Sequence, residues 1–304
     1  MDTDPAGPPS TPGPPDTPGA PGTPVPPVAR PVGRAGRNLP VAIGVGALLG
    51  GVAIVTLLTV KATFLIYLAL ALGIALTELA GGLAKRDIRI PVIPVAAGGV
   101  AIGTCMYWLG PQQALAALGL TVIAIFAWRL PGGASGYVKD VTAGVFALIY
   151  LPFLASFAVA MLVPADGPRR VLTFVILTVS SDIGGYAAGI TLGRGGRHLM
   201  APAISPKKTW EGFAGSVIAC LAAGALCLRF LLHGNVWAGL LTGAAAVLAA
   251  ILGDLVESMI KRDLDIKDMG SLLPGHGGVL ERLDSLLAVA PVVWVLLYVF
   301  IPAS

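Results

Sequence analysis

Long apolar runs alternate with short polar segments from Pro40 to the carboxyl terminus. A helix needs about 20 consecutive, mostly apolar residues to cross a bilayer, and runs of roughly this length recur along the chain. They predict nine membrane-spanning helices, over residues 40–60, 63–83, 91–109, 112–128, 140–163, 171–192, 212–232, 236–257 and 286–302. The third and fourth runs are separated only by Gly110 and Pro111. We therefore expect an all-α, polytopic membrane protein.

The segment before the first run has a different pattern. Residues 1–38 are dominated by Pro, Gly, Thr and Ala and contain no apolar run. Such a composition buries too little surface to order the chain. We expect a disordered cytoplasmic tail over 1–38 and one transmembrane domain over 39–304. The first apolar run starts near Val41, too late and too long for a cleaved signal peptide, so we expect it to be retained.

The composition supports this class of protein. The chain is 56% hydrophobic and 12% charged, whereas soluble domains average about 25% charged residues. Cys105, Cys220 and Cys227 lie in or near apolar runs without metal-ligand or redox spacing, so we expect them to be small core residues. The basic residues behind the net charge of +4 lie in short loops between spans. Because such residues report orientation in the membrane, we expect no nucleic-acid partner.

The distribution of Lys and Arg predicts the orientation in the membrane. Drawing nine spans places all but four of the 20 basic residues on the side of the amino terminus; the four exceptions are Lys61, Arg169, Arg170 and Arg229. Short cytoplasmic loops are enriched in Lys and Arg. We expect a bacterial inner-membrane protein whose amino terminus is cytoplasmic and whose carboxyl terminus is outside.

The first polar segment of interest covers residues 180–212. Asp182 lies within an apolar run, where a carboxylate is costly and usually contacts a metal or a substrate, although a hydrogen bond to a neighbouring helix is the simpler alternative. The stretch SPKKTWEG begins at Ser205. Its Lys207 and Lys208 lie beside the start of a predicted helix that Ser205 or Thr209 could cap. A helix amino terminus with nearby lysines favours anions, but an ordinary positively charged loop would look similar.

The second segment, residues 254–285, is rich in charged side chains. Spacing places Asp254, Glu257, Ser258 and Lys261 on one face of a helix, and Glu281 and Asp284 repeat the acidic spacing at the start of the last span.

Two acidic pairs on two helices could hold a divalent cation through oxygen atoms, as Mg²⁺ prefers. His276 lies in the Gly-rich turn between them, where a histidine is more often merely solvated. The alternating charges of residues 262–268 could likewise be a solvated helix end. Acids for a metal together with bases for phosphates nevertheless suit phosphoryl or nucleotidyl transfer.

The segment from Ser258 to Asp284 resembles the signature of phosphatidate cytidylyltransferases, also called CDP-diglyceride synthases. The matching positions are Ser258, Lys261, Arg262, Lys267, Asp268, Gly270, Pro274, Gly275, His276, Gly277, Gly278, Arg282 and Asp284. The SPKKTWEG stretch resembles the second hallmark of that family, and the likeness extends from about Pro40 to the carboxyl terminus.

The resemblance implies a membrane enzyme that joins CTP to phosphatidate and forms CDP-diacylglycerol and pyrophosphate with Mg²⁺, a second cation being an open alternative. It implies metal ligands at Asp254, Glu281 and Asp284, to which the intramembrane Asp182 is added as a candidate. Catalytic roles are expected for Asp254, Lys261 and Asp284. Substrate-binding roles are expected for Ser205, Lys207, Lys208, Arg262, Lys267, His276 and Arg282.

One position departs from the family pattern, which has Asp where this chain has Glu281. The extra methylene can displace a carboxylate by about 1.5 Å, enough to disturb a near-ideal Mg²⁺ shell. We expect retained but reduced activity, or a supporting role for Glu281 behind the metal ligands.

Two other functions remain as alternatives at this stage. A CTP-dependent lipid kinase would need the same phosphate site but would release CDP. A cation-coupled transporter would explain the acids, yet transporters are often built from two related halves, and no such repeat is visible in the sequence. The small residues from Gly243 to Ala246 permit close helix packing, either within the chain or in a homodimer.

Overall fold

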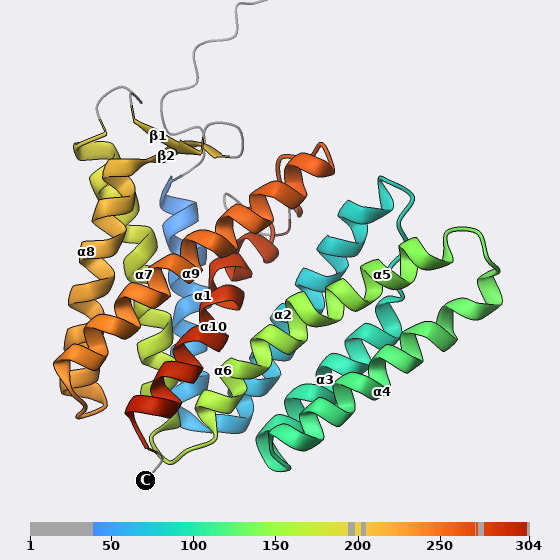
Figure 1. The fold of residues 1–304 in the computed structure, drawn as a ribbon, viewed down its shortest axis with the longest axis horizontal. Helices are drawn as coiled ribbons and strands as arrows, with labels where there is room; N and C mark the ends of the chain where they lie inside the picture. The colour runs from blue at the N-terminus through green and yellow to red at the C-terminus, as the bar shows by residue number, and fades with distance from the viewer. Residues whose placement is uncertain (1–38, 194–197, 202–204, 271, 273–276, 303–304) are drawn as a thin grey trace, which may run out of the picture. The chain divides into compact units, whose positions relative to one another are not determined.

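The structure is a computed structural model that describes residues 39–193, 198–201, 205–270, 272 and 277–302. The predicted tail over 1–38 and the predicted site residue His276 lie outside these residues. The described part is almost entirely helical (Figure 1).

Its α-helices are α1 (Leu39–Thr59), α2 (Lys61–Ala84), α3 (Val92–Trp108), α4 (Pro111–Arg129), α5 (Tyr137–Leu148), α6 (Leu154–Leu162), α7 (Gly167–Thr191), α8 (Trp210–Leu226), α9 (Val236–Asp263) and α10 (Leu280–Phe300). Three short helical turns join or extend them: η1 (Leu130–Gly132), η2 (Ile149–Phe153) and η4 (Cys227–Leu231). Since η2 joins α5 to α6 without a break, each of the nine predicted spans corresponds to a helical segment in the described residues.

Seven of these segments are long and apolar enough to cross a membrane, as judged on the described residues. The shorter apolar stretches are Leu48–Thr59 of α1 and Val92–Trp108. The prediction of an all-α membrane protein is therefore confirmed, although the spans over 236–257 and 286–302 were drawn too short at their polar ends. The chain remains helical there to Asp263, in part because Glu257 and Lys261 pair across one helical turn.

One element of the fold was not predicted. Strands β1 (Leu199–Ala201) and β2 (Ser205–Thr209) form a small antiparallel hairpin. Leu199 lies opposite Thr209, and Ala201 lies opposite Ser205. The SPKKT part of the basic segment is therefore a strand rather than a loop.

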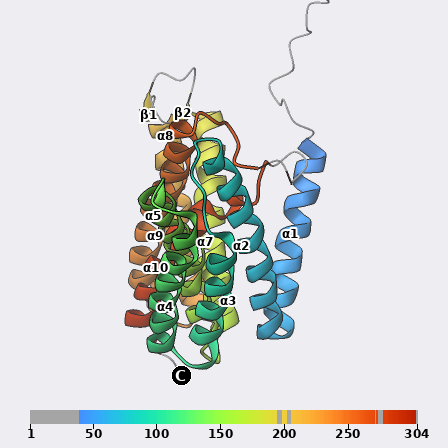
Figure 2. The same cartoon turned by 90° about the vertical axis from the view of Figure 1, so that its right-hand side faces the viewer.

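Helices α7, α8 and α9 pack side by side, α9 also packs against α10, and α10 packs against α6. Figure 2 shows α2 between α1 and the helices around α7, and α1 packs on α2. A side chain at Gly243 would meet the backbone of Cys220 in α8. Gly243 therefore packs against a helix of the same chain.

Contacts between distant segments mark the end of the helical region that lies opposite the β hairpin. At one end, Lys61 donates hydrogen bonds to the carbonyls of Val163 and Pro164, and the buried Arg170 donates to the carbonyl of Ile301. The end of α1, the start of α7 and the end of α10 thus lie together. The hairpin β1–β2 lies at the other end (Figure 1).

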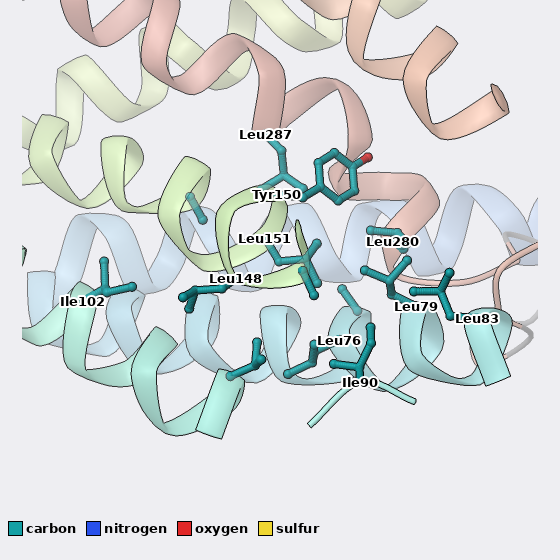
Figure 3. Close-up of a cluster of buried hydrophobic side chains, with 14 of the residues drawn as sticks. Leu76, Leu79, Leu83, Ile90, Ile102, Leu148, Tyr150, Leu151, Leu280 and Leu287 are labelled. Carbon is teal, nitrogen blue, oxygen red and sulfur yellow. The ribbon is translucent and has the colours of Figure 1, made fainter. Parts of the chain in front are cut away.

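A cluster of buried apolar side chains fixes the start of α10 (Figure 3). It joins α2, the α5–η2 segment and α10 through Leu76, Leu79, Leu83, Leu148, Leu151, Leu280 and Leu287. Within a bilayer such packing, rather than exclusion from water, holds helices in register. The acidic first turns of α10 are therefore held in a defined position relative to α2 and η2.

Candidate active site

A cavity of about 280 Å³ lies between α7, α8 and α9 beside the β hairpin. Four of the predicted site residues line it: Asp182 of α7, Ser205 and Lys208 of β2, and Asp254 of α9. Residues from two separate segments of the sequence thus face one space. The space is large enough for a polar head group or part of a nucleotide, judged against ligand pockets of about 300–1,000 Å³.

The basic segment approaches this cavity along β2 and leads directly into α8. The hydroxyl of Thr209 accepts a hydrogen bond from the backbone N–H of Gly212 at 3.1 Å, so Thr209 is the N-cap. Of the two capping residues that the sequence allowed, the structure selects Thr209, while Ser205 remains in the strand. Lys207 also belongs to β2, and its side chain lies outside the described part.

An ion pair joins the basic segment to the acidic one. Lys208 Nζ lies 2.6 Å from Asp254 Oδ2, and both side chains are partly exposed to the cavity side. The other oxygen of Asp254 accepts a hydrogen bond from the hydroxyl of Ser258 at 3.3 Å. A phosphate bound by Lys208 and a cation bound by the carboxylates would therefore meet at Asp254.

Three carboxylates gather at the facing surfaces of α9 and α10. Ligand oxygens of Asp254, Glu257 and Asp284 all lie within 4.8 Å of one another, and we call these three residues the acidic cluster. Glu257 is 1% exposed and pairs with Lys261. A Cβ atom at Gly253 would lie only 2.6 Å from the carbonyl oxygen of Asp284. The glycine therefore permits the close approach of α10 that brings Asp284 to the other two acids.

The geometry gives Glu281 different partners from those of the acidic cluster. Its Oε1 accepts the backbone N–H of Met269 at 2.5 Å, and its Oε2 accepts the N–H of Gly278 at 2.8 Å. Among the described residues, Glu281 does not belong to the group of acids that gather within 4.8 Å. Its contacts are those of a residue that holds the segment between α9 and α10.

A second glutamate holds the same segment, and the sequence analysis missed it. Glu78 of α2 accepts the backbone N–H groups of Val279 and Leu280 at 3.1 and 2.9 Å. It thereby satisfies N–H groups at the start of α10, which no carbonyl within that helix can accept. A Cβ at Gly278 would lie 2.5 Å from the Glu281 carboxylate and 2.6 Å from that of Glu78, so two glutamates enclose this glycine. The sequence did contain a signal for Glu78, because it is a lone glutamate inside the apolar run 63–83. A carboxylate is costly there, as it is at Asp182.

The remaining predicted residues lie around the same end of the molecule. Arg262 is in the last turn of α9, Arg282 is in the first turn of α10, and Lys267 lies in the connection between the two helices. All three are exposed. Unlike Lys208, none of them lines the cavity.

Comparison with known proteins decides between the functions that the sequence left open. The model of the cytidylyltransferase family matches residues 41–300. The chain belongs to the cytidylyltransferase family.

Individual relatives agree with this membership. A phosphatidate cytidylyltransferase of Mycobacterium leprae is 41% identical over 280 residues, which cover 87% of this chain and 89% of the relative. One of Mycobacterium tuberculosis is 41% identical over 277 residues, which cover 87% of this chain and 84% of the relative. One of Staphylococcus epidermidis is 39% identical over 134 residues, covering 44% of this chain and 50% of the relative. The family resemblance and the expectation of an enzyme are confirmed, and the kinase and transporter alternatives lose their support.

The acidic cluster of this cytidylyltransferase-family chain has the chemistry of a site for a hard cation. All three candidate ligands offer carboxylate oxygens, the donors that Mg²⁺ prefers. In addition, Glu257 Oε1 is buried and has no hydrogen-bond partner among the described residues. A buried, unpaired carboxylate oxygen is costly, and a bound cation would remove that cost. The residues present therefore fit Mg²⁺.

Proposed function

We propose that the chain is an integral membrane enzyme of phospholipid biosynthesis that transfers the cytidylyl group of CTP to phosphatidate, forming CDP-diacylglycerol and pyrophosphate. The observation that carries this proposal is the ion pair between Lys208 and Asp254. It places a phosphate-binding side chain of the basic segment directly beside the acidic cluster. Nucleotidyl transfer needs these two functions within one site because both reactants are polyanions.

The reaction requires little covalent participation by the protein. An oxygen of the phosphatidate phosphate attacks the α-phosphorus of CTP, a new P–O bond forms, and the bond between the α-phosphorus and the bridging oxygen breaks to release pyrophosphate. The lipid phosphate is already largely ionised at neutral pH, so no strong general base is needed. The protein acts mainly by aligning the two phosphates and offsetting their charge.

The acidic cluster would hold Mg²⁺ through Asp254, Glu257 and Asp284. When bound, Mg²⁺ neutralises phosphate charge and orients the reacting oxygens. The contacts of Glu281 support a role behind these ligands, in holding the segment that precedes α10. Asp182 lines the cavity across from Asp254 and remains a candidate for a second cation.

The basic residues would bind the phosphates from two directions. Ser205, Lys207 and Lys208 approach from β2. A second group, from α9 to the start of α10, consists of Lys261, Arg262, Lys267, His276 and Arg282. Lys261, which pairs with Glu257, would keep its ammonium group beside the acidic cluster and so carry positive charge to the reacting phosphates.

The site end of the molecule would face the cytoplasm, where CTP is available, in a bacterial inner membrane. The end of α1 lies near Pro164 and the end of α10 lies near Arg170, at the end opposite the hairpin. Helix α1 therefore starts at the end of the molecule that holds the site, and α10 finishes at the opposite end. This agrees with a cytoplasmic amino terminus and an external carboxyl terminus. A homodimer remains a prediction, for which Gly243 gives no support because it packs against α8.

The products of the purified protein in detergent test this function. The protein is given phosphatidate and CTP, and the lipid and water-soluble products are separated. CDP-diacylglycerol and pyrophosphate in equal amounts are expected. CDP together with a newly phosphorylated lipid would contradict the proposal and restore the kinase.

A further inference from the structure

Tyr150 lies in the π-helical turn η2 between α5 and α6. Such turns are rare, and they often occur at functional sites because the additional residue changes the direction of a side chain. The Tyr150 ring stacks on Phe146, with ring centroids 5.3 Å apart and an interplanar angle of 11°. The ring is therefore held in a defined orientation.

The hydroxyl of Tyr150 is buried. The residue is 7% exposed, and its hydroxyl oxygen has no hydrogen-bond partner among the described residues. Buried tyrosine hydroxyls usually find a partner, since an unpaired one loses its hydration without compensation. An exception of this kind calls for an explanation such as an ion, a water molecule or a catalytic role.

The orientation of the Tyr150 ring directs its hydroxyl along α10. Figure 3 shows the Tyr150 ring between Leu280 and Leu287 of α10, with its oxygen pointing away from the leucines of α2. Leu280, Asp284 and Leu287 are spaced i, i+4 and i+7 and share one face of α10. The hydroxyl therefore lies on the face of α10 that carries Asp284.

The other acids of the cluster lie on the same side. Ligand oxygens of Glu257 and Asp254 lie within 4.8 Å of that of Asp284. Glu257 Oε1 is the second buried oxygen of this region that lacks a partner among the described residues. An unpaired donor and an unpaired acceptor thus adjoin one cluster of carboxylates.

We propose that Tyr150 is a positioning residue of the acidic cluster, whose hydroxyl donates a hydrogen bond through one water molecule to the Glu257 Oε1 that is unpaired among the described residues. The bond would fix the orientation in which Asp254, Glu257 and Asp284 bind a divalent cation. Groups behind the ligands of a metal commonly act in this way. The inference rests on the metal site of the proposed function and adds a residue from a helix outside both sequence motifs.

Tyr150→Phe tests this role, because it retains the ring and its stacking on Phe146 and removes only the oxygen. The matched control is Tyr298→Phe on α10, since Tyr298 is 72% exposed and lines a different cavity, together with Arg170. Binding of Mn²⁺ to purified protein is measured by electron paramagnetic resonance without CTP or lipid. The thermal midpoint is measured with and without Mn²⁺.

The expected result is an increase of about tenfold in the Mn²⁺ dissociation constant of Tyr150→Phe, as is typical when a group supporting the ligands is lost, with an unchanged constant for Tyr298→Phe. The Mg²⁺ concentration for half-maximal turnover should rise by the same factor. Unchanged Mn²⁺ affinity, with an equal or higher thermal midpoint, would overturn the inference, because removing an idle buried hydroxyl is neutral or stabilising.

A second comparison applies if Tyr150→Phe also weakens the fold. The substitution is repeated in a Glu257→Gln background. An effect on Mn²⁺ affinity that is much smaller there than in the wild type supports a contact with the acidic cluster, whereas an equal effect in both backgrounds overturns it. A wild-type protein that binds no Mn²⁺ would overturn the metal site and this inference together. Normal binding by the wild type with no response to Tyr150→Phe would overturn the inference alone.

Discussion

Lys208 Nζ and Asp254 Oδ2 lie 2.6 Å apart, although the two residues come from different segments of the sequence and different elements of the fold. The pair spans the cavity from β2 to α9. It has a functional consequence, because the same ammonium group that neutralises Asp254 can bind a phosphate oxygen of a substrate.

Lys208→Ala should lower kcat about 100-fold, the loss typical of one group that stabilises charge in the transition state. The lysine adjoins the acidic cluster, so its contribution should be greatest where the phosphates react. Initial rates over a range of CTP concentrations check this. The control is Lys85→Ala, which removes an exposed lysine just after α2 and should leave the rate unchanged. A higher KM for CTP with normal kcat would instead assign Lys208 to ground-state binding.

Asp254→Asn and Asp284→Asn should each reduce product formation to background, because each removes a charge from the proposed cation site while preserving side-chain size. Membrane insertion and the thermal midpoint should remain close to those of the wild type. Incorporation of label from CTP into lipid is the measurement. Normal turnover in both variants would refute the assignment of the acidic cluster as the metal site.

Glu281→Gln should lower turnover roughly tenfold, the equivalent of about 1.4 kcal/mol, because the amide can accept from only one of the N–H groups of Met269 and Gly278. The Mg²⁺ concentration for half-maximal activity should change little. Glu281→Asp, which restores the residue of the family pattern, should remain active. A Mg²⁺ requirement raised strongly in Glu281→Gln would show that Glu281 is a ligand after all.

Glu78→Gln should loosen the start of α10, since one of the N–H groups of Val279 and Leu280 loses its acceptor. Hydrogen exchange at these two amides should become about tenfold faster, corresponding to a local loss of about 1.4 kcal/mol. Thr77→Ala is the neighbouring control, because the Thr77 hydroxyl donates a hydrogen bond within its own helix, to the carbonyl of Ile74. Equal exchange rates in Glu78→Gln and the wild type would exclude the capping role.

Gly253→Ala should lower turnover about 100-fold, because the added methyl group would push the Asp284 backbone away from α9 and displacements near 1 Å can have this effect. Gly103→Ala is the control, since a Cβ there meets no atom within 4 Å. The control should retain full activity. Full activity in Gly253→Ala would mean that the spacing between α9 and α10 is not critical.

The sequence predicted the helices well because membrane spans depend on the length and apolarity of a run, which are local properties. It missed the β1–β2 hairpin because Leu199–Ala201 and Ser205–Thr209 are short and lack an alternating pattern. Apolarity alone ends one span at residue 257 and begins the last at 286, whereas α9 extends to Asp263 and α10 starts at Leu280. The helical spacing of the charged residues had indicated these extensions, and the structure pairs Glu257 with Lys261 in one of them.

The candidate site was predictable only as far as local spacing allowed. The spacing of Asp254 and Glu257, and that of Glu281 and Asp284, identified two acidic helix faces. It could not show that Asp284 turns toward α9 while Glu281 turns toward the preceding segment, because packing at Gly253 and in the leucine cluster sets that rotation. Glu78 could be noticed in the sequence as a lone acid inside an apolar run, but its place at the start of α10 could not be predicted, since that contact is entirely tertiary.

The most direct test of the central claim is transfer of label from CTP, labelled at the α-phosphate, to phosphatidate by the purified protein with Mg²⁺ present or chelated. The account predicts labelled CDP-diacylglycerol when Mg²⁺ is present, none when it is chelated, and none from Asp284→Asn under either condition. Equal transfer after chelation, or label that ends in CDP rather than lipid, would contradict it.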